Sequence, residues 1–380
     1  MKKQNKIFYW SPSLVSIATN DAVINSAYSL SRYNKSYDTY IINFFGEFER
    51  FRERINKKKI KTIDYYKKSL FNILPRHGKI KSRFSFIIIF LLSFYPLKNI
   101  LKKETPDYLV IHLITSLPLI LLVLFNFKTK FILRISGFPK LNFFRKFLWK
   151  MTLKKICFIT CPTEATQKDM SNQKIVNENK IDVLFDPIIS PKNIINNIKI
   201  SKNNWKDRNY FLAIGRLTKQ KNFIFLIDVF KKFNNNKNNK LIIVGEGEQK
   251  DKLLKFIQLN KLSDTVEIHN YTEEIFDYYK YARCFILSSL WEDPGFVLIE
   301  AAFCNLNIIS SNCPNGPSEL LNNGKDGFMY ESDNKEDFLR KFNEYLSTNK
   351  KDLFDKRLRV KINSKNFTLF KHSENLKAIL

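Results

Sequence analysis

One feature of the sequence limits the possible folds more than any other. Short apolar runs alternate with helical patterns, and this series occurs twice along the chain. Apolar runs at 6–10, 108–114 and 131–135 belong to the first series, and runs at 210–214 and 241–244 belong to the second. Strands that are separated by single helices form parallel sheets with right-handed crossovers. The sequence therefore predicts an α/β protein with two Rossmann-like, doubly wound domains.

An Asn- and Lys-rich stretch without a core pattern separates the two series. We predict a first domain over residues 1–190, a linker over 191–207 and a second domain over 208–362. For the remaining segment, 363–380, a return to the first domain is one of the arrangements that stay open. Within the first domain, the polar and basic residues 47–82 are predicted to be irregular. A chain of 380 residues is long enough for two domains of this size.

Charge is distributed unevenly along the chain. The formal net charge is +28, and residues 1–160 hold 30 Lys and Arg against 8 Asp and Glu. Compositional drift towards Lys explains part of this excess, but it does not explain why one half carries most of it. An anionic partner is the functional alternative: membrane headgroups, a lipid-linked pyrophosphate or nucleic acid. Because no basic-and-aromatic recognition motif is present, we expect no nucleic-acid partner.

Two apolar stretches are candidate membrane segments. Residues 84–97 are shorter than the roughly 20 residues that a spanning helix needs, and Pro118 and polar residues interrupt 108–127. For 84–97, a core helix and an interfacial helix with basic flanks both remain open. The mean hydropathy of −0.27 argues against a polytopic membrane protein. The five cysteines, an odd number, indicate reduced thiols in the cytoplasm and no disulfide framework or zinc site.

Ligands of doubly wound sheets bind at the carboxyl ends of the strands, so the loops there are the candidate sites. The loop at 215–222 follows a strand and begins with Gly215, which permits a sharp turn. It carries Arg216 and Lys221, a guanidinium fork and a mobile ammonium group that together suit the two phosphates of a nucleotide diphosphate. A solvated basic loop is the alternative for this segment alone.

The loop at 289–300 also joins a strand to a helix, and it contains two carboxylates. Pro294 and Gly295 allow the backbone to approach a ligand, and the helix that follows presents free N–H groups to an anion. Glu300 is placed to hold a ribose diol, and Glu292 to reach the hydroxyls of a transferred sugar. Acidic pairs at this spacing are common, so the pair alone is a weak signal.

Other loops carry less information. Gly245 begins a Gly-Glu-Gly turn after the strand at 241–244, and it lacks the third glycine of a dinucleotide fingerprint. A Ser/Glu capping pattern explains most of the loop at 310–319. In the first half, His112 follows an apolar strand, where such a residue is more often structural than catalytic.

Four motifs in register resemble those of glycosyltransferase family 4: "AIGRLTKQKN", "LIIVGEGEQ", "SSLWEDPGFVLIEAAFCN" and "IISSNCPNGPSELLNNGKDGF". The resemblance covers nearly all of residues 208–332. It implies a GT-B fold, in which two domains face a central cleft. It also implies a metal-independent transfer from a nucleotide-diphosphate sugar, with UDP as the expected nucleotide, and retention of the anomeric configuration. No separate cofactor is implied.

The resemblance also implies roles for individual residues. Arg216 and Lys221 match the family's pyrophosphate-binding pair, Glu292 the glutamate near the donor sugar, and Glu300 the glutamate on the ribose. His112 matches a first-domain histidine near the transferred sugar. The backbone that meets sugar and phosphate corresponds to Pro294, Gly295, Phe296 and Val297, and Gly215 and Gly245 complete the expected nucleotide-sugar site.

The first half is similar, more loosely, to the acceptor domain of bacterial members that build cell-surface glycans, through "ATNDAVINSAYSL", "LVIHLITSLPL" and "LRISGFPKLN". The implied acceptor is a glycan or a polyprenyl-pyrophosphate-linked oligosaccharide, as in polysaccharide or lipopolysaccharide synthesis at the inner face of the cytoplasmic membrane. Many members carry a glycine pair in the first loop, whereas 11–20 has none here. A nucleotide-sugar epimerase or hydrolase on the same fold is the alternative function, and a basic nucleic-acid-binding protein is a more remote one.

Overall fold

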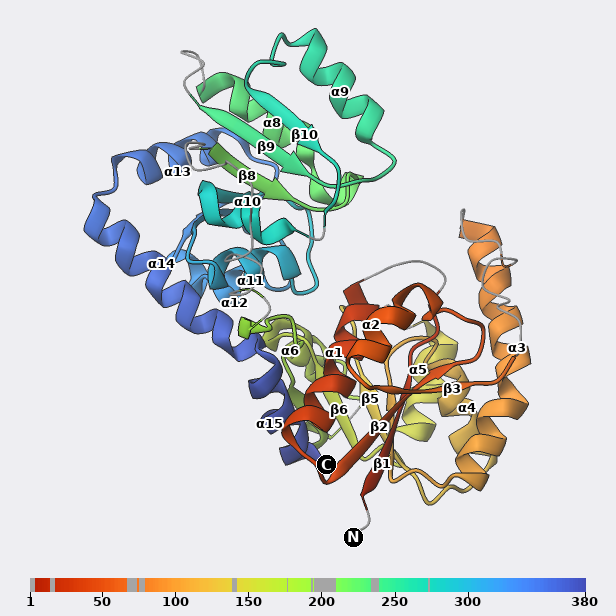
Figure 1. The fold of residues 1–380 in the computed structure, drawn as a ribbon. Helices are drawn as coiled ribbons and strands as arrows, with labels where there is room; N and C mark the ends of the chain where they lie inside the picture. Colours follow the sequence, from red (N-terminus) through yellow and green to blue (C-terminus); the bar gives the residue numbers. More distant parts are fainter. Residues whose placement is uncertain are drawn as a thin grey trace. The chain divides into compact units, whose positions relative to one another are not determined.

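The structure is a computed structural model, and it describes residues 4–13, 18–66, 74, 79–138, 142–175, 177–192, 194, 210–233, 239–272 and 274–380. The chain forms two compact units, Met1–Ile188 with Leu369–Leu380, and Ile189–Thr368 (Figure 1). The predicted α/β fold with two Rossmann-like domains is confirmed. Most of the predicted linker lies outside the described residues.

The first unit is built on a seven-stranded parallel sheet in the order β3-β2-β1-β4-β5-β6-β7. Its strands are β1 (Asn5–Trp10), β2 (Tyr37–Asn43), β3 (Lys61–Asp64), β4 (Tyr108–Ile111), β5 (Lys130–Arg134), β6 (Phe158–Cys161) and β7 (Ile181–Val183). The sequence order reverses between β1 and β4, which is the switch point of the sheet.

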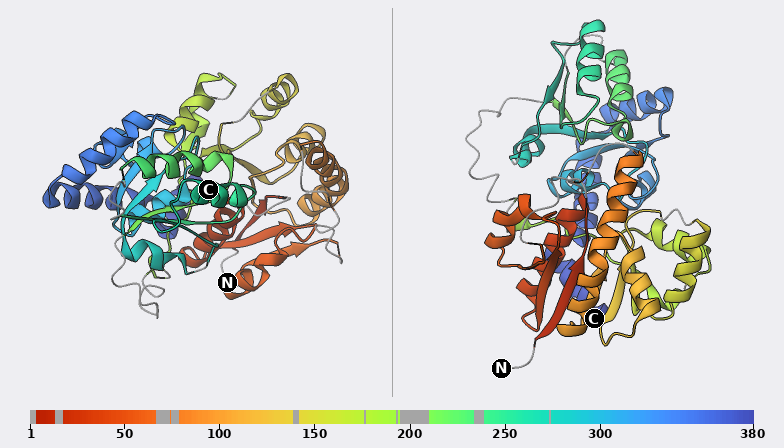
Figure 2. Two further views of the ribbon diagram at one scale, coloured as in Figure 1. Left: turned by 90° about the horizontal axis from the view of Figure 1, so that it is seen from above. Right: turned by 90° about the vertical axis from the view of Figure 1, so that its right-hand side faces the viewer.

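Helices cover both faces of this sheet (Figures 1 and 2). They are α1 (Ala18–Tyr33), α2 (Arg52–Lys57), α3 (Lys79–Lys103), α4 (Ser116–Leu124), α5 (Phe143–Thr152), α6 (Glu164–Asn172) and α15 (Leu369–Ile379). Ile7 and Tyr9 pack with α1, α2 and α15, whereas Phe8 and Trp10 pack with α3, α4 and α5. The strand is apolar at successive positions because both of its faces are buried.

The prediction that 47–82 is irregular was wrong for most of the described residues, 47–66, 74 and 79–82, whereas 67–73 and 75–78 lie outside the described residues. This segment contains α2, β3 and the first residues of α3, which is longer than the expected helix. The edge strand β3 has a neighbour on one side only, and its residues are partly or fully exposed. It therefore lacks the apolar run by which the central strands are recognised. The short apolar run at 183–185 predicts a further strand, and the structure has this strand two residues earlier, as β7.

The second unit contains a six-stranded parallel sheet in the order β10-β9-β8-β11-β12-β13. The strands are β8 (Tyr210–Ile214), β9 (Lys240–Val244), β10 (Val266–His269), β11 (Ala282–Leu287), β12 (Asn307–Ser311) and β13 (Phe328–Tyr330). The helices are α8 (Phe223–Phe233), α9 (Lys250–Leu259), α10 (Ile275–Tyr281), α11 (Phe296–Phe303), α12 (Pro317–Leu320), α13 (Lys335–Ser347) and α14 (Lys350–Ser364).

The C-terminal helix α15 belongs to the first unit, although it follows the second in the chain. The His372 ring lies 2.8 Å from Ser26 Oγ and 2.7 Å from the carbonyl oxygen of Phe185. Burial lowers the pKa of His372 to about 3, so the ring is neutral.

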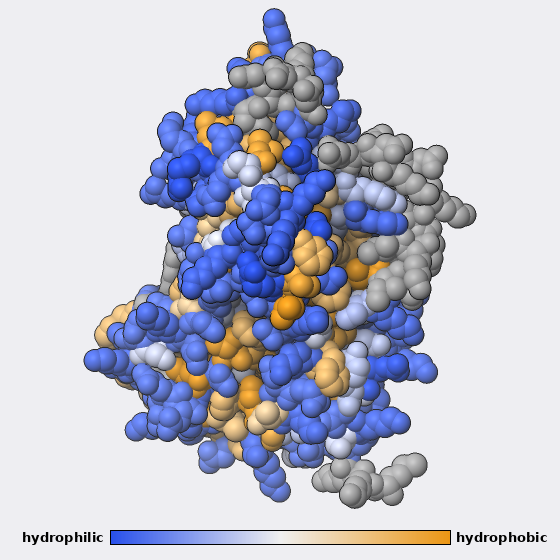
Figure 3. Space-filling model, turned by 90° about the vertical axis from the view of Figure 1, so that its left-hand side faces the viewer, coloured by the Kyte–Doolittle hydropathy of each residue, from blue (hydrophilic) through white to orange (hydrophobic). Residues whose placement is uncertain are grey.

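On the side of the molecule that Figure 3 shows, hydrophilic residues predominate and hydrophobic residues form separate patches.

Candidate functional site: a strand-end ion pair in the second unit

The switch point of the second sheet lies between β8 and β11, where the sequence order of the strands reverses. In parallel sheets all carboxyl ends lie at one edge, and the adjacent loops diverge at the switch point to leave a crevice. The two loops that flank it are those predicted to bind the donor. One contains Arg216 and Lys221, and the other contains Glu292 and leads into α11.

Lys221 and Glu292 form an ion pair across this switch point. Lys221 Nζ lies 2.6 Å from Glu292 Oε1, and the side chains are 12% and 5% exposed. The Ser289 hydroxyl donates a second hydrogen bond to the same oxygen. The two opposite charges therefore lie together with little exposure to solvent, where their electrostatic interaction is stronger than in water.

Glycines bring the loops after β8 and β9 into contact. A Cβ atom on Gly215 would lie 2.9 Å from Lys221 Cε, so the stem of the lysine folds over this glycine. A Cβ atom on Gly245 would lie 1.9 Å from the carbonyl oxygen of Gly215, which leaves no room for a side chain. Gly245 therefore acts in this structure by close packing of two backbones at the site.

The loop before α11 is held from the side of β12. Gly295 precedes the helix with φ +93°, a left-handed conformation that favours glycine. A Cβ atom on Gly316 would lie 2.1 Å from the carbonyl oxygen of Pro294, so the two loops touch. The Glu292 N–H donates to Pro314 O at 3.1 Å. Phe296 and Val297 open α11, whose first N–H groups point along the helix axis to this edge.

Glu300, one turn into α11, accepts a hydrogen bond from the Tyr279 hydroxyl at 3.0 Å. Burial and the charge of Glu300 raise the pKa of Tyr279 well above its usual value, so the phenol remains a donor. Arg216 is exposed, and its Nη2 lies 3.2 Å from Gln220 Oε1. Gln220 also donates to Trp291 O at 2.9 Å, which links the two loops.

The structure thus brings Lys221, Glu292, Gly215, Gly245 and Gly295 together at this edge. Arg216 lies on the same loop as Lys221, and Glu300 lies one turn into the helix that follows Glu292. Sequence reasoning missed the residues that hold them in place, namely Ser289, Gln220 and Tyr279. Hydroxyl and amide side chains at strand ends are common, and no spacing connects Tyr279 with Glu300. The long-range pairings could therefore be found only in the folded chain.

His112 lies in the first unit, directly after β4 and next to the switch point of that sheet. The side chain is 7% exposed, and Nε2 has no hydrogen-bond partner within the described part of the chain. Burial, together with the nearby Arg134 and His372, lowers the pKa of His112 well below its usual value. The ring is therefore neutral at pH 7 and suits a hydrogen bond to a hydroxyl group.

The glycine-free loop at 11–20 is described only at its two ends. Ser11, Ser13 and Asn20 are buried, and Asn20 Nδ2 donates to Ser13 Oγ at 2.9 Å. Residues 14–17 lie outside the described residues.

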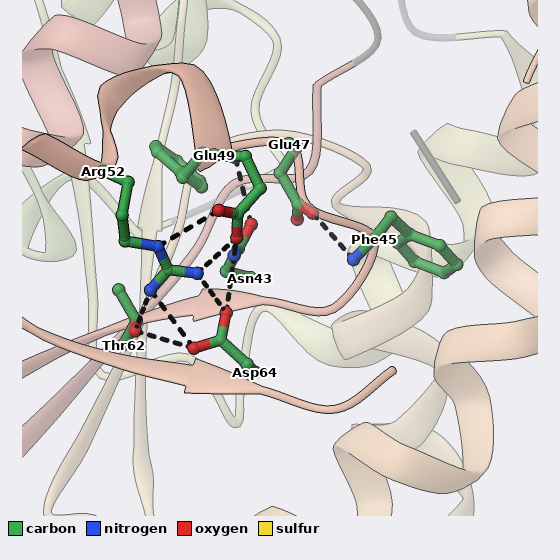
Figure 4. A network of polar contacts seen from close by, with 8 residues as sticks. Asn43, Phe45, Glu47, Glu49, Arg52, Thr62 and Asp64 are labelled. Atoms are coloured by element: carbon green, nitrogen blue, oxygen red, sulfur yellow. Dashed lines mark hydrogen bonds and ion pairs between the residues drawn. The ribbon is translucent and has the colours of Figure 1, made fainter. Parts of the chain in front are cut away.

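A polar network occupies the ends of β2 and β3 at the same edge of the first sheet (Figure 4). Arg52 pairs with Glu49 and with Asp64, and Asn43 donates to both carboxylates at 3.0 and 2.6 Å. Beside it, Glu47 is 2% exposed, and this burial raises its pKa to about 7. The sequence offered no sign of this carboxyl, because burial alone distinguishes it from other glutamates.

The raised pKa of Glu47 predicts a pH dependence of stability. Between pH 4.5 and about 7 the folded protein holds a proton that the unfolded chain has released. The contribution of this group to the free energy of unfolding is therefore largest below pH 4.5 and declines as the pH rises to 7. From pH 5 to pH 8, wild type is expected to lose about 1–3 kcal/mol more stability than Glu47→Gln. Urea unfolding at both pH values measures this difference, and parallel profiles would contradict it.

Comparison with known sequences relates the chain to glycosyltransferases. Residues 195–367 match the family model described as Glycosyl transferases group 1. An uncharacterized glycosyltransferase of Methanocaldococcus jannaschii is 30% identical over 311 residues, which are 77% of this chain and 73% of that protein. An α-1,4-N-acetyl-D-galactosaminyltransferase of Campylobacter jejuni is 24% identical over 306 residues, which are 79% of this chain and 78% of that protein. The name of that enzyme gives a substrate linked to diphospho-undecaprenol.

Solved structures share the fold. A glycosyltransferase from Rickettsia africae superimposes with a TM-score of 0.75 at 17% identity, covering 100% of this chain and 98% of that one. The Anabaena protein HepE in complex with UDP-glucose gives 0.70 at 14% identity, covering 99% of each chain. The two doubly wound units, the strand-end site and these similarities define a glycosyltransferase. The chain belongs to the glycosyl transferases group 1 family.

Proposed function

We propose that this enzyme transfers a hexose from a nucleotide-diphosphate sugar, with UDP as the expected nucleotide, to a lipid-linked glycan and retains the anomeric configuration. The observation that carries the proposal is the ion pair of Lys221 and Glu292 at the switch point of the second sheet. A cation and a carboxylate at one strand edge match a donor that has a diphosphate at one end and hydroxyl groups at the other.

In the proposed reaction, the bond between the sugar C1 and the β-phosphate oxygen breaks, and its electron pair leaves with the diphosphate. The acceptor hydroxyl oxygen forms the new bond to C1 on the same face, and its proton passes to the departing phosphate. Arg216, Lys221 and the N–H groups at the start of α11 stabilise the charge that develops on the leaving group. Glu292 binds hydroxyls of the sugar, Glu300 the ribose, and His112 contributes a neutral hydrogen bond from the acceptor domain.

The proposal assigns charge stabilisation to protein cations and not to a metal ion. The chain contains no Asp-x-Asp pair, the usual carboxylate clamp for a metal-bound nucleotide diphosphate. We therefore propose metal-independent transfer, for which activity unchanged by EDTA is the measurable consequence.

The acceptor is proposed from two features. The Campylobacter relative is named for a diphospho-undecaprenol-linked oligosaccharide, and the first half of this chain carries most of the positive charge. A polyprenyl pyrophosphate is an anion at a membrane surface, and basic residues attract both the pyrophosphate and the headgroups. We place the enzyme at the cytoplasmic face of the membrane, in cell-surface polysaccharide synthesis.

Product analysis tests this function. A panel of nucleotide sugars is first ranked by thermal shift, and the best donor is then incubated with and without a polyprenyl-pyrophosphate-linked acceptor. We expect a glycosylated lipid whose new linkage has the anomeric configuration of the donor, measured by NMR. If the donor were epimerised or hydrolysed equally fast with and without acceptor, the alternative function, an epimerase or hydrolase, would be supported. An inverted linkage would exclude retention.

A further inference from the structure

We propose that the outer faces of α3 and α5 form one membrane-binding surface that lies in the interface of an anionic lipid bilayer and does not cross it. We call this the α3–α5 surface. It is represented by Phe84, Ile87, Leu91, Phe143, Phe144 and Phe147, which are between 56% and 80% exposed. Both helices cover the same face of the first sheet, with α4 between them (Figure 2).

Helix α3 has apolar residues on its outer face as well as on the face that packs against the core. The positions that face the core include Ser85 and Ser93, both 0% exposed, together with Ile89 at 2%. The opposite positions are Phe84 at 59% and Leu91 at 66%. A helix at a protein–water boundary carries polar residues on its outer face. The outer face of α3 is therefore suited to an apolar environment.

Helix α5 repeats this arrangement. Phe143 and Phe144 are each 80% exposed and Phe147 is 58% exposed, while Trp149 and Thr152 of the same helix are buried. Three exposed phenylalanines within five residues are more than the scattered apolar side chains of an ordinary surface. Large aromatic rings gain free energy when they leave water, and they are suited to the boundary of a bilayer.

Charge identifies the occupant as a lipid surface rather than a second copy of the chain. Residues 65–163 contain 18 Lys and Arg and only two acidic residues. Lys146 and Lys150 are exposed on α5, and Lys102 and Lys103 are exposed at the end of α3. Two copies meeting at this surface would bring like charges together, whereas anionic headgroups would neutralise them.

By length and composition, 84–103 is apolar enough to cross a membrane, but its place in the fold argues against this. Helix α3 is the crossover between β3 and β4 of one sheet. Leu97 and Leu101 are buried in the core of the first unit with α4 and β4. A spanning orientation would remove them from that core. We therefore place α3 in the plane of the interface, with its outer face in contact with acyl chains.

The surface also has a definite position relative to the acceptor side of the enzyme. In a parallel α/β sheet the crossover helices run opposite to the strands, so α3 and α5 begin at the carboxyl edge. His112 lies at the same edge, directly after β4. The purpose of the surface rests on the proposed function, because it would hold a lipid-linked acceptor near this edge. The binding itself does not depend on that function.

Flotation with vesicles tests the surface directly. The full chain is mixed with vesicles of phosphatidylcholine alone or with 30% phosphatidylglycerol (on the order of a bacterial anionic fraction). The test variant is Phe143→Ser/Phe144→Ser/Phe147→Ser, with Ile87→Ser/Leu91→Ser as a second variant on α3. The matched control, Leu254→Ser/Leu259→Ser/Leu346→Ser, removes three exposed apolar side chains of the second unit. Circular dichroism and thermal unfolding verify the fold of each variant.

We expect wild type and control to bind the anionic vesicles in a salt-sensitive manner. Each test variant is expected to bind them at least about tenfold more weakly than wild type. Equal binding by all four proteins would overturn the proposal. So would retention on the membrane through alkaline carbonate, which would indicate a spanning helix. A dimer in sedimentation analysis that the α5 variant dissociates, without vesicle binding, would assign the surface to a second copy.

An activity measurement separates this proposal from the proposed function. The α5 variant is expected to lose transfer to a long-chain acceptor in vesicles and to keep transfer to a water-soluble short-chain acceptor. If wild type binds vesicles but transfers sugar to neither acceptor, the proposed function fails and the membrane surface stands. If wild type transfers sugar to both but binds no vesicles, the surface fails and the function stands.

Discussion

Lys221→Ala is expected to lower the rate of sugar transfer by about a hundredfold or more, the range found when one preorganised charge stabiliser is removed from an active site. The Lys221 side chain is 12% exposed, whereas Arg216 of the same loop is exposed, and we propose that Lys221 stabilises the charge on the leaving diphosphate. Steady-state kinetics with saturating donor measure the effect in kcat, because the interaction strengthens in the transition state.

A structural effect of the same substitution must be separated from this one. Without Lys221, Glu292 is left nearly buried beside Ser289 and without its cation, and such a loss costs about 3–5 kcal/mol of stability. The double variant Lys221→Met/Glu292→Gln contains neither charge and is expected to recover most of that stability. If it also recovered transfer, or if Lys221→Ala turned over like wild type, Lys221 would have no role in stabilising the leaving group.

Glu292→Ala is expected to lower transfer by about tenfold to a hundredfold while affinity for the free nucleoside diphosphate changes little or rises. Glu292 neutralises Lys221 through Oε1, so its removal leaves the cation more available to phosphate. The hydroxyls of the sugar, which the free nucleoside diphosphate lacks, lose their acceptor. Isothermal titration with the diphosphate and kinetics with the full donor measure the two effects separately.

Glu300→Gln is the matched control for this division of roles. The Tyr279 hydroxyl of α10 donates a hydrogen bond to Glu300, the residue that we propose binds the ribose. The control should therefore weaken binding of the free nucleoside diphosphate, whereas Glu292→Ala should not. An equal collapse of diphosphate affinity in both variants would contradict the assignment of Glu292 to the sugar.

The central strands of both sheets were predictable because each is buried on both faces and is therefore a continuous apolar run. Strands such as β1 and β8 fall within one residue of the predicted ranges. The edge strand β3 and helix α5 were not recognised. β3 is polar because it has one neighbour. Helix α5 has apolar residues at helical spacing, so its sequence pattern does predict a helix, and only the exposure of its phenylalanines required the structure.

The residues of the candidate site likewise divide into those that the sequence predicts and those that only the structure shows. Arg216, Lys221, Glu292 and Glu300 could be proposed from the sequence because strand-to-helix loops of parallel sheets share one edge. The residues that support them could not be proposed. Gln220 and Tyr279 contact Trp291 and Glu300, which are distant in the sequence. Ser289 lies three residues from Glu292, but nothing in the sequence distinguishes its hydroxyl from that of other serines at strand ends. The importance of Gly245 was also visible only in the structure, where the backbone of Gly215 occupies the space of a side chain.

By itself, the sequence determined the class of fold and the position of the donor loops, since hydrophobic periodicity and strand-to-helix order are local properties of the chain. Only the tertiary structure decided which charges meet, which carboxyl is buried and which apolar face remains exposed. The pairing of Lys221 with Glu292, the burial of Glu47 and the outward face of α3 all depend on segments that are distant along the chain. Burial and proximity set their energies, and both exist only after the sheets have formed.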